Sequence, residues 1–169
     1  MSKNSIQFAK HMICYTDGAC NSNKKRSGIG IVWYFPNQLV DITNGENNIS
    51  KPCFAYYEEI FPNREGIEFP TNNDAEYTSL IRSMEHAISS QCEELTVFMD
   101  SQLVVSQVTG AWKINYTHLR NYKKIIDSMG KKIKLNVYHV KREHNQWADY
   151  QSKLSIGMAP EKSKYSFKI

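Results

Sequence analysis

The sequence lacks a long apolar segment. No stretch near its beginning is apolar enough for a signal peptide, and none has the length of a membrane span. Charge of one sign is also missing, because 21 Lys and Arg against 17 Asp and Glu leave a net charge of only +4. Such a balance permits a polyanionic partner without requiring one. We therefore expect a soluble cytoplasmic protein without a membrane partner.

Cysteine is scarce and has no metal-binding spacing. None of the four cysteines belongs to a Cys-x-x-Cys or Cys-x-x-His pair, which argues against a zinc site. Three of them, at positions 14, 20 and 53, lie in or beside apolar runs. This placement favours free thiols in or near a core, in a reducing compartment.

Two common catalytic signatures are absent as well. Gly28-Ile29-Gly30 lacks a third glycine and opens a strand rather than a helix, so it predicts no dinucleotide site and no nucleotide cofactor. Ser101 is not surrounded by a Gly-x-Ser-x-Gly elbow and is therefore no convincing serine nucleophile. We also find no internal repeat and no low-complexity segment.

What is present is enough for one packed domain. The 169 residues are 41% hydrophobic and 12% aromatic, which favours a core over disorder. We expect a single monomeric domain over residues 1–169, with a core at about 12–156. The Lys- and Ser-rich tail at 157–169 is expected to be flexible.

The spacing of apolar residues changes along the chain. Asp74–Ser90 has apolar residues three and four positions apart, as in an amphipathic helix. Leu95–Met99 is nearly continuously apolar, which suits a strand covered on both faces. The predicted order is three strands, helix, strand, two helices, strand and helix, at 12–16, 28–35, 54–61, 74–90, 95–99, 101–108, 118–129, 134–140 and 145–156. This order predicts a mixed sheet with helices on its faces, of α/β or α+β type.

Four acidic residues stand at or near the ends of these elements: Asp17, Glu76, Asp100 and Asp149. Open α/β sheets form their sites at the carboxyl ends of strands, so Asp17 and Asp100 would meet if their strands are parallel neighbours. Each acid also has a purely structural interpretation. Asp17-Gly18 is a common turn pair, Asp100 could close a strand, and Asp149 could favour a helix N-terminus. Asn73-Asp74-Ala75-Glu76 matches a capping box.

The residues around the acids favour a functional interpretation. The segments YTDGAC (15–20), TNNDAEY (71–77), MDSQLVV (99–105) and NQWAD (145–149) follow one another in this order. With them the sequence resembles the type 1 ribonuclease H family, from about Met12 to about Ile156. The resemblance implies a ribonuclease H-like fold, a five-stranded mixed sheet with helices on both faces. It also implies that the four acids bind metal and act in catalysis.

The family resemblance implies an endoribonuclease that cuts the RNA strand of RNA–DNA hybrids and leaves 5′-phosphate and 3′-hydroxyl ends. Four converging carboxylates need protons or cations, since two unit charges 4 Å apart repel by about 4 kcal/mol at an effective dielectric near 20. Hard oxygen ligands favour Mg²⁺ or Mn²⁺ over zinc. Two ions, roughly 3.5–4 Å apart, would activate a water and stabilise the leaving 3′ oxygen.

Selectivity for RNA requires contacts to 2′-hydroxyls across the shallow minor groove. By resemblance, the candidates for these contacts are Cys20, Asn21, Asn23, Asn72, Asn73 and Gln102. Thr71 and Asn23 are similar in position to residues that bind a phosphate of the DNA strand. The interpretation of all these residues as turn and cap residues stays open.

A run of basic residues begins at Lys113, directly after Trp112, and continues to Lys134 with Asp127 as its single acid. Beside a hydrolase site, such a run favours a phosphate-contacting surface over a solvated helix face. Trp112 itself could pack against the sugar-phosphate backbone of the substrate or cover the core.

The sequence departs from the family pattern in three places. The basic helix and loop that many members carry after the third acid is absent, so the chain resembles the short branch. The loop before the last helix is shortened, and His144 is the candidate for the family's mobile histidine, with an exposed loop histidine as the alternative. Residues 41–70 are longer than the usual connection and could be an idle insertion, a partner site or part of a substrate rim.

Two other functions stay open beside the ribonuclease. One is a non-catalytic ribonuclease H-like module that binds nucleic acid or a protein partner. The other is a related nuclease directed at DNA, against which the TNN and DSQ flanks argue.

Overall fold

The computed structural model describes residues 7–38, 50–158 and 160–167. Within these ranges five strands form one sheet: β1 (His11–Asn21), β2 (Arg26–Tyr34), β3 (Phe54–Ile60), β4 (Glu94–Met99) and β5 (Lys134–His139). The α-helices are α1 (Asn72–Ser89), α2 (Gln102–Val108), α3 (Thr117–Met129) and α4 (Gln146–Ser155). Short 3-10 helices lie at Pro36–Gln38, Arg142–His144 and Lys162–Lys164. The predicted order of elements is confirmed.

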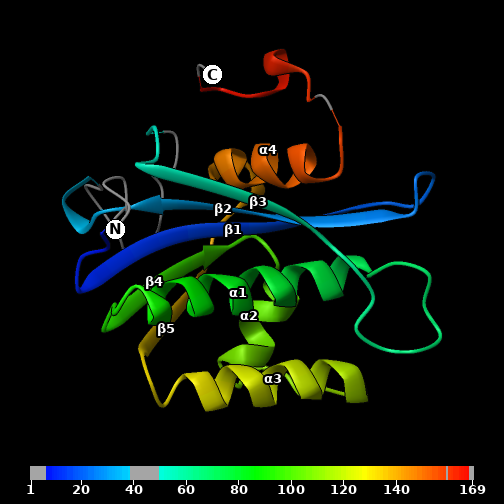
Figure 1. The fold of residues 1–169 in the computed structure, drawn as a ribbon, viewed down its shortest axis with the longest axis horizontal. Helices are drawn as coiled ribbons and strands as arrows, with labels where there is room; N and C mark the ends of the chain where they lie inside the picture. Colours follow the sequence, from blue (N-terminus) through cyan, green and yellow to red (C-terminus); the bar gives the residue numbers. More distant parts are fainter. Residues whose placement is uncertain (1–6, 39–49, 159, 168–169) are drawn as a thin grey trace, which may run out of the picture.

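The sheet is mixed, with strand order β3-β2-β1-β4-β5. The first three strands pair antiparallel, whereas β4 and β5 run parallel to β1. Helices α1, α2 and α3 lie on one side of the sheet, and α4 lies on the other (Figure 1). The predicted five-stranded mixed sheet with helices on both faces is therefore confirmed.

The core consists of two clusters, one on each face of the sheet. Successive side chains of a strand point to opposite faces, so β1 contributes to both clusters. Met12 and Cys14 belong to the cluster under α1, α2 and α3, whereas Ile13 and Tyr15 belong to the cluster that includes Trp147 of α4. Burial on both faces explains why the strands next to the centre read as continuous apolar runs.

Strand β1 continues further than we expected. We placed Asp17-Gly18 at a turn after the first strand, but the antiparallel pairing with β2 runs from Ile13↔Tyr34 to Asn21↔Arg26. The turn prediction is therefore wrong, because pairing with β2 outweighs the local turn preference of this dipeptide. The parallel pairing with β4, in contrast, ends at Thr16↔Met99. Asp17 thus lies within the pairing of β1 with β2 and one residue beyond the pairing of β1 with β4.

Part of the tail that we expected to be flexible contacts α4. The described residues 160–167 return to α4, where the ring of Phe167 stacks on Trp147 with centroids 3.9 Å apart. Phe167 is only 7% exposed, because it completes the cluster on this face of the sheet. The part of the long 41–70 segment at 41–49 lies outside the described residues.

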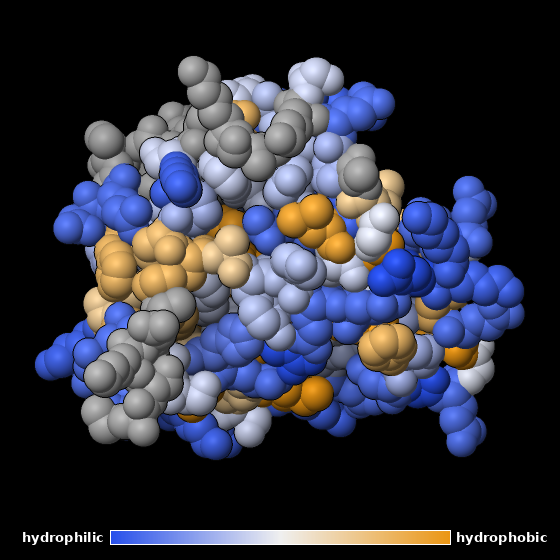
Figure 2. All heavy atoms as spheres, turned by 45° about the horizontal axis from the view of Figure 1, so that its top comes forward, coloured by the Kyte–Doolittle hydropathy of each residue, from blue (hydrophilic) through white to orange (hydrophobic). Residues whose placement is uncertain are grey.

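The face shown in Figure 2 is mostly hydrophilic, and its apolar residues form a few separate groups. Within the described ranges, none of the helices combines the length and the apolar character needed to cross a bilayer. All four cysteines are free thiols, as their spacing suggested.

Candidate metal centre

Three of the four acids lie together at one edge of the sheet. Asp17, Glu76 and Asp100 each offer a carboxylate oxygen, and these oxygens lie within 4.8 Å of one another. Asp17 and Asp100 meet because β1 and β4 are parallel neighbours and both residues directly follow the last paired positions, Thr16 and Met99. Asp17 and Asp100 therefore lie side by side at the edge of the sheet where the parallel pairing of β1 and β4 ends.

Gly18 allows the first helix to approach this edge. A Cβ atom at Gly18 would lie 2.7 Å from both the backbone carbon and the Cβ of Ala75. No ordinary side chain fits at that separation, so only glycine lets the first turn of α1 contact β1. The contact places Glu76, the next residue of α1, beside Asp17.

Helix α1 begins differently from our expectation. Its N-cap is Thr71, and the capping box pairs Thr71 with Asp74 rather than Asn73 with Glu76. The prediction of an Asn73–Glu76 box is therefore wrong, since Thr71 supplies the hydroxyl that receives the N–H of Asp74. As a result, the carboxylate of Glu76 is not used by the cap. Its Oε2 atom is buried without a hydrogen-bond partner among the described residues.

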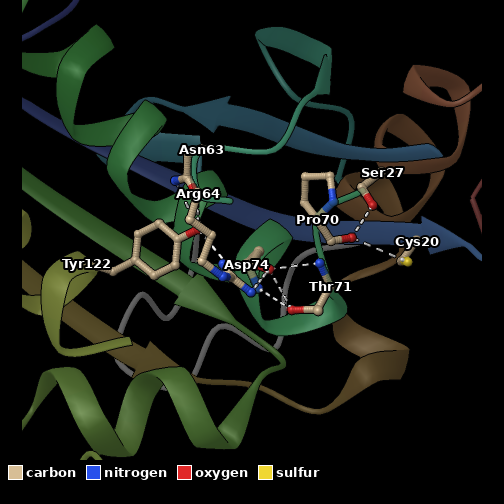
Figure 3. A network of polar contacts seen from close by, with 8 residues as sticks. All are labelled: Cys20, Ser27, Asn63, Arg64, Pro70, Thr71, Asp74 and Tyr122. Carbon is tan, nitrogen blue, oxygen red and sulfur yellow. Dashed lines mark hydrogen bonds and ion pairs between the residues drawn. The ribbon is translucent and has the colours of Figure 1, made fainter. Parts of the chain in front are cut away.

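A polar network fixes the start of α1 (Figure 3). The carboxylate of Asp74 accepts hydrogen bonds from Arg64 at 3.0 Å, the Thr71 hydroxyl at 2.8 Å and the Tyr122 hydroxyl at 2.8 Å. Burial acts to raise the pKa of Asp74, but these bonds, first that of Arg64, lower it to about 2. The network engages the hydroxyl of Thr71 in the cap, although the residue is exposed, and it fixes the first turn of α1.

Burial and mutual repulsion disfavour the charged forms of the clustered acids. Asp17 is 5% exposed, and its pKa is raised well above the ordinary value by burial and then by the charge of Glu76. Burial is also the main cause that raises the pKa of Glu76 to about 8, although a hydrogen bond with Asp17 opposes it. The pKa of Asp100 is raised by burial as well. Without a cation, the cluster therefore retains protons near neutral pH.

Asn145 connects the last helix to this edge. Its Nδ2 atom donates to the backbone oxygen of Thr16 at 2.9 Å and to Oδ2 of Asp100 at 3.0 Å. The residue is fully buried and is the N-cap of α4. It thus sets both the orientation of Asp100 and the position of the helix that carries Asp149. Sequence reasoning quoted Asn145 only as part of a motif and missed this role.

Asp149 lies in the first turn of α4 and lines the same cavity, but it is outside the tight cluster. Its Oδ2 atom accepts hydrogen bonds from Lys153 at 3.0 Å and from the Tyr165 hydroxyl at 2.7 Å. The cavity has a volume of about 470 Å³ and is lined by Asp17, Gly18, Ala19, Cys20, Asn72, Asn73, Glu76, Asp100, Ser101, Arg142, Asp149, Lys153 and Met158. All four acids therefore face one space.

The residues we named for substrate contact divide into two groups. Three of them, Cys20, Asn72 and Asn73, line this cavity. The thiol of Cys20 also donates to the backbone oxygen of Pro70, at 3.6 Å, which connects β1 to the start of α1 (Figure 3). Among the described lining residues, the cavity does not include Asn21, Asn23, Thr71, Gln102, Trp112 or Lys113.

The residues named for substrate contact that do not line the cavity are either exposed or hydrogen-bonded to nearby residues of the chain. The side chain of Asn21 accepts the N–H of Lys24 at 3.1 Å, as a turn residue would. Trp112 is 47% exposed and therefore does not cover the core. His144 lies in the 3-10 helix before α4, is partly buried and has an Nδ1 atom without a partner in the described part of the chain. It is not one of the lining residues.

Two cationic residues at the cavity were not expected from the sequence. Arg142 comes from the 3-10 helix before α4, and Lys153 lies one turn after Asp149. The spacing of Asp149 and Lys153, four residues apart on a helix, was a signal that could have indicated the second of them. No comparable local signal marks Arg142.

Comparison with known proteins agrees with this geometry. The family model described as reverse transcriptase-like matches residues 62–155. The bifunctional protein Rv2228c of Mycobacterium tuberculosis is 33% identical over 87 residues, which are 51% of this chain and 24% of that protein. A ribonuclease HI of Halobacterium salinarum is 31% identical over 106 residues, which are 63% of this chain and 44% of that protein. The matched part of this chain thus covers less than half of the length of each of these relatives.

Solved structures show the same fold. The RNase H1 of Halobacterium salinarum superposes with a TM-score of 0.70 at 25% identity, over 87% of this chain and 98% of that one. LC11-RNase H1, which was solved in complex with an RNA/DNA hybrid, has a TM-score of 0.68 at 26% identity, over 86% of this chain and 96% of that one. Since the family model covers more than half of the sequence and the fold is that of these enzymes, the chain belongs to the reverse transcriptase-like, ribonuclease H-like family.

Proposed function

We propose that the protein is a metal-dependent ribonuclease H that hydrolyses the RNA strand of RNA–DNA hybrids and leaves 5′-phosphate and 3′-hydroxyl ends. The observation that carries this proposal is the cluster of Asp17, Glu76 and Asp100, with one buried oxygen of Glu76 lacking a partner. The relatives named ribonuclease H, and the hybrid bound to LC11-RNase H1, support the choice of substrate.

The donor set fits a hard divalent cation. All ligand atoms on offer are carboxylate oxygens, which suit Mg²⁺ or Mn²⁺, and the unpartnered Glu76 oxygen is the kind of buried atom that a cation would satisfy. Asp17, Glu76 and Asp100 would hold one ion, and Asp149 would complete the site for a second. Bound ions would supply an activated water and charge stabilisation at the leaving 3′ oxygen.

The protein's own groups would bind and orient the hybrid around these ligands. Arg142 and Lys153 place positive charge in the cavity, where a phosphate of the RNA strand would bind. Cys20, Asn72 and Asn73 lie on its rim and could contact 2′-hydroxyls. Asn145 keeps Asp100 in place through its hydrogen bond. His144, close to the start of α4, stays our candidate for proton transfer or product release.

Cleavage of a labelled hybrid tests the proposal. The protein is incubated with a hybrid, a DNA duplex or a double-stranded RNA of the same sequence, with EDTA, Mg²⁺ or Mn²⁺. We expect metal-dependent loss of only the hybrid's RNA strand, with 5′-phosphate ends. Hybrid binding that is indifferent to metal and leaves the RNA intact would instead indicate a non-catalytic binding module. Equal cleavage of the DNA duplex would indicate a DNA-directed nuclease.

A further inference from the structure

The described end of the chain is attached to α4 at two points. The ring of Phe167 stacks on Trp147 with an interplanar angle of 12°. One residue earlier, the backbone N–H of Ser166 donates to the side-chain oxygen of Gln146 at 2.6 Å. Residues 165–167 therefore have a defined position on the helix that carries Asp149, on the side of the sheet opposite to α1 (Figure 1).

Tyr165 lies between this attachment and the cavity. Its ring contacts Tyr150 edge-on at 5.6 Å and Phe167 at 5.0 Å, and the Nζ atom of Lys153 lies 5.9 Å from its centroid. These contacts hold the ring so that its hydroxyl donates to Oδ2 of Asp149 at 2.7 Å. Lys153 donates to the same oxygen from within α4. One carboxylate oxygen thus has two donors, which come from different parts of the chain.

We propose that Tyr165 is a positioning residue for the fourth acid. The Tyr165 hydroxyl and Lys153 both donate hydrogen bonds to Oδ2 of Asp149. The other carboxylate oxygen, Oδ1, has no hydrogen-bond partner among the described residues and is therefore the one available to a cation. The hydroxyl thereby limits the rotation of the carboxylate before any ligand arrives. Removing an outer hydrogen bond of this kind typically weakens metal binding about 10- to 100-fold. This inference rests on the proposed metal site.

The substitution Tyr165→Phe tests this role, because it keeps the ring and its contacts and removes only the hydroxyl. Tyr150→Phe is a matched control, since it makes the same change in the neighbouring ring, whose hydroxyl bonds to no described residue. Binding of Mn²⁺ to the full chain is measured by titration calorimetry without substrate. We expect Tyr165→Phe to raise the apparent Kd at least about 10-fold, and Tyr150→Phe to leave it unchanged.

Thermal unfolding in EDTA provides the second readout. A purely structural hydroxyl would lower the apo unfolding temperature and leave the Mn²⁺ affinity as it is, and this result would overturn the inference. Tighter Mn²⁺ binding by Tyr165→Phe would overturn it too, because the hydroxyl would then keep Asp149 away from the cation. If the unsubstituted protein binds no Mn²⁺, the proposed metal site itself fails, which is a different and recognisable outcome.

Discussion

At the scale of single residues, the clustered acids destabilise the folded protein when they are ionised, but binding a cation requires their ionised form. Asp17, Glu76 and Asp100 are buried close together, and each has a raised pKa. A protein under selection for stability alone would not keep such a group, because every ionised member repels the others. The arrangement makes sense where a cation supplies the missing charge.

The first prediction concerns pH. The pKa of Glu76 is raised from an ordinary value of 4.5 to about 8 in the folded protein. Between pH 4.5 and pH 8 the carboxyl group therefore binds a proton in the folded state and has lost it in the unfolded state. The free energy of unfolding in EDTA should therefore be highest near pH 5 and should fall as the pH rises towards 8, by at most about 1.4 kcal/mol per pH unit for one such group. Urea unfolding at several pH values measures this slope.

Glu76→Gln should flatten that pH dependence, because the amide does not titrate. Saturating Mg²⁺ should flatten it as well, since a cation favours the ionised cluster. A free energy of unfolding that stays constant from pH 5 to pH 8 in the unsubstituted apo protein would contradict the prediction.

The second prediction concerns charge removal at the cluster. Asp17→Asn and Asp100→Asn should each abolish hybrid cleavage, while the apo free energy of unfolding stays equal or increases, because one repelling charge is lost. Asp127→Asn is a suitable control, since this exposed acid lies outside the cavity and pairs with Lys123 on α3. Gel assays and urea unfolding measure the two effects. Unfolding of either cluster variant would point to a structural role for that acid.

At the scale of elements, the order of strands and helices was predictable because several of them have a clear apolar pattern, such as the helical spacing at 74–90 and the continuous run at 95–99. The details at Asp17-Gly18 and Thr71 were not. The dipeptide prefers a turn locally, but the nine residues of β2 pair with it and its neighbours. The sequence suggested a capping box from Asn73 to Glu76, whereas the structure uses Thr71 and Asp74. The carboxylate of Asp74 is also bound by Arg64 and Tyr122, which come from other segments.

The third prediction tests the contact between β1 and α1. Gly18→Ala should push the first turn of α1 away from Asp17, because the added Cβ would lie 2.7 Å from Ala75. We expect a loss of about 1–3 kcal/mol in stability and a large loss of cleavage. Gly130→Ala is the control, since its Cβ would approach no closer than 3.3 Å to Ile126. A Gly18→Ala variant with normal activity would show that the helix does not depend on this close approach.

At the scale of the whole molecule, the candidate site could be predicted only in part. The motifs pointed to four acids, and the parallel pairing of β1 and β4 explains why two of them meet. Tyr165, Arg142 and the buried contact of Asn145 could not be predicted, because they depend on how α4 and the residues before it pack against segments that are distant in the sequence. The position of residues 160–167 follows from the Phe167–Trp147 stacking, which no local pattern indicates.

The fourth prediction concerns cation binding by the whole protein. At the proposed site, Mg²⁺ would bind only where the acids are assembled, so it should stabilise the folded state by about 2.7 kcal/mol at 100 times its Kd. The unfolding temperature should rise with Mg²⁺ concentration, and Asp100→Asn should remove most of this rise. Calorimetric scans with Mg²⁺ and with the same ionic strength of NaCl would separate cation binding from salt screening. An equal effect of NaCl would contradict the prediction.

The four acids come from β1, α1, the end of β4 and α4, so the cavity they line joins segments that are far apart along the chain. Contacts of such long sequence separation tend to form late in folding. The transition state for folding should therefore contain an incomplete cation site. A divalent ion would then slow the unfolding of the protein while leaving its folding rate nearly unchanged, so the folded state would last longer but would not form faster.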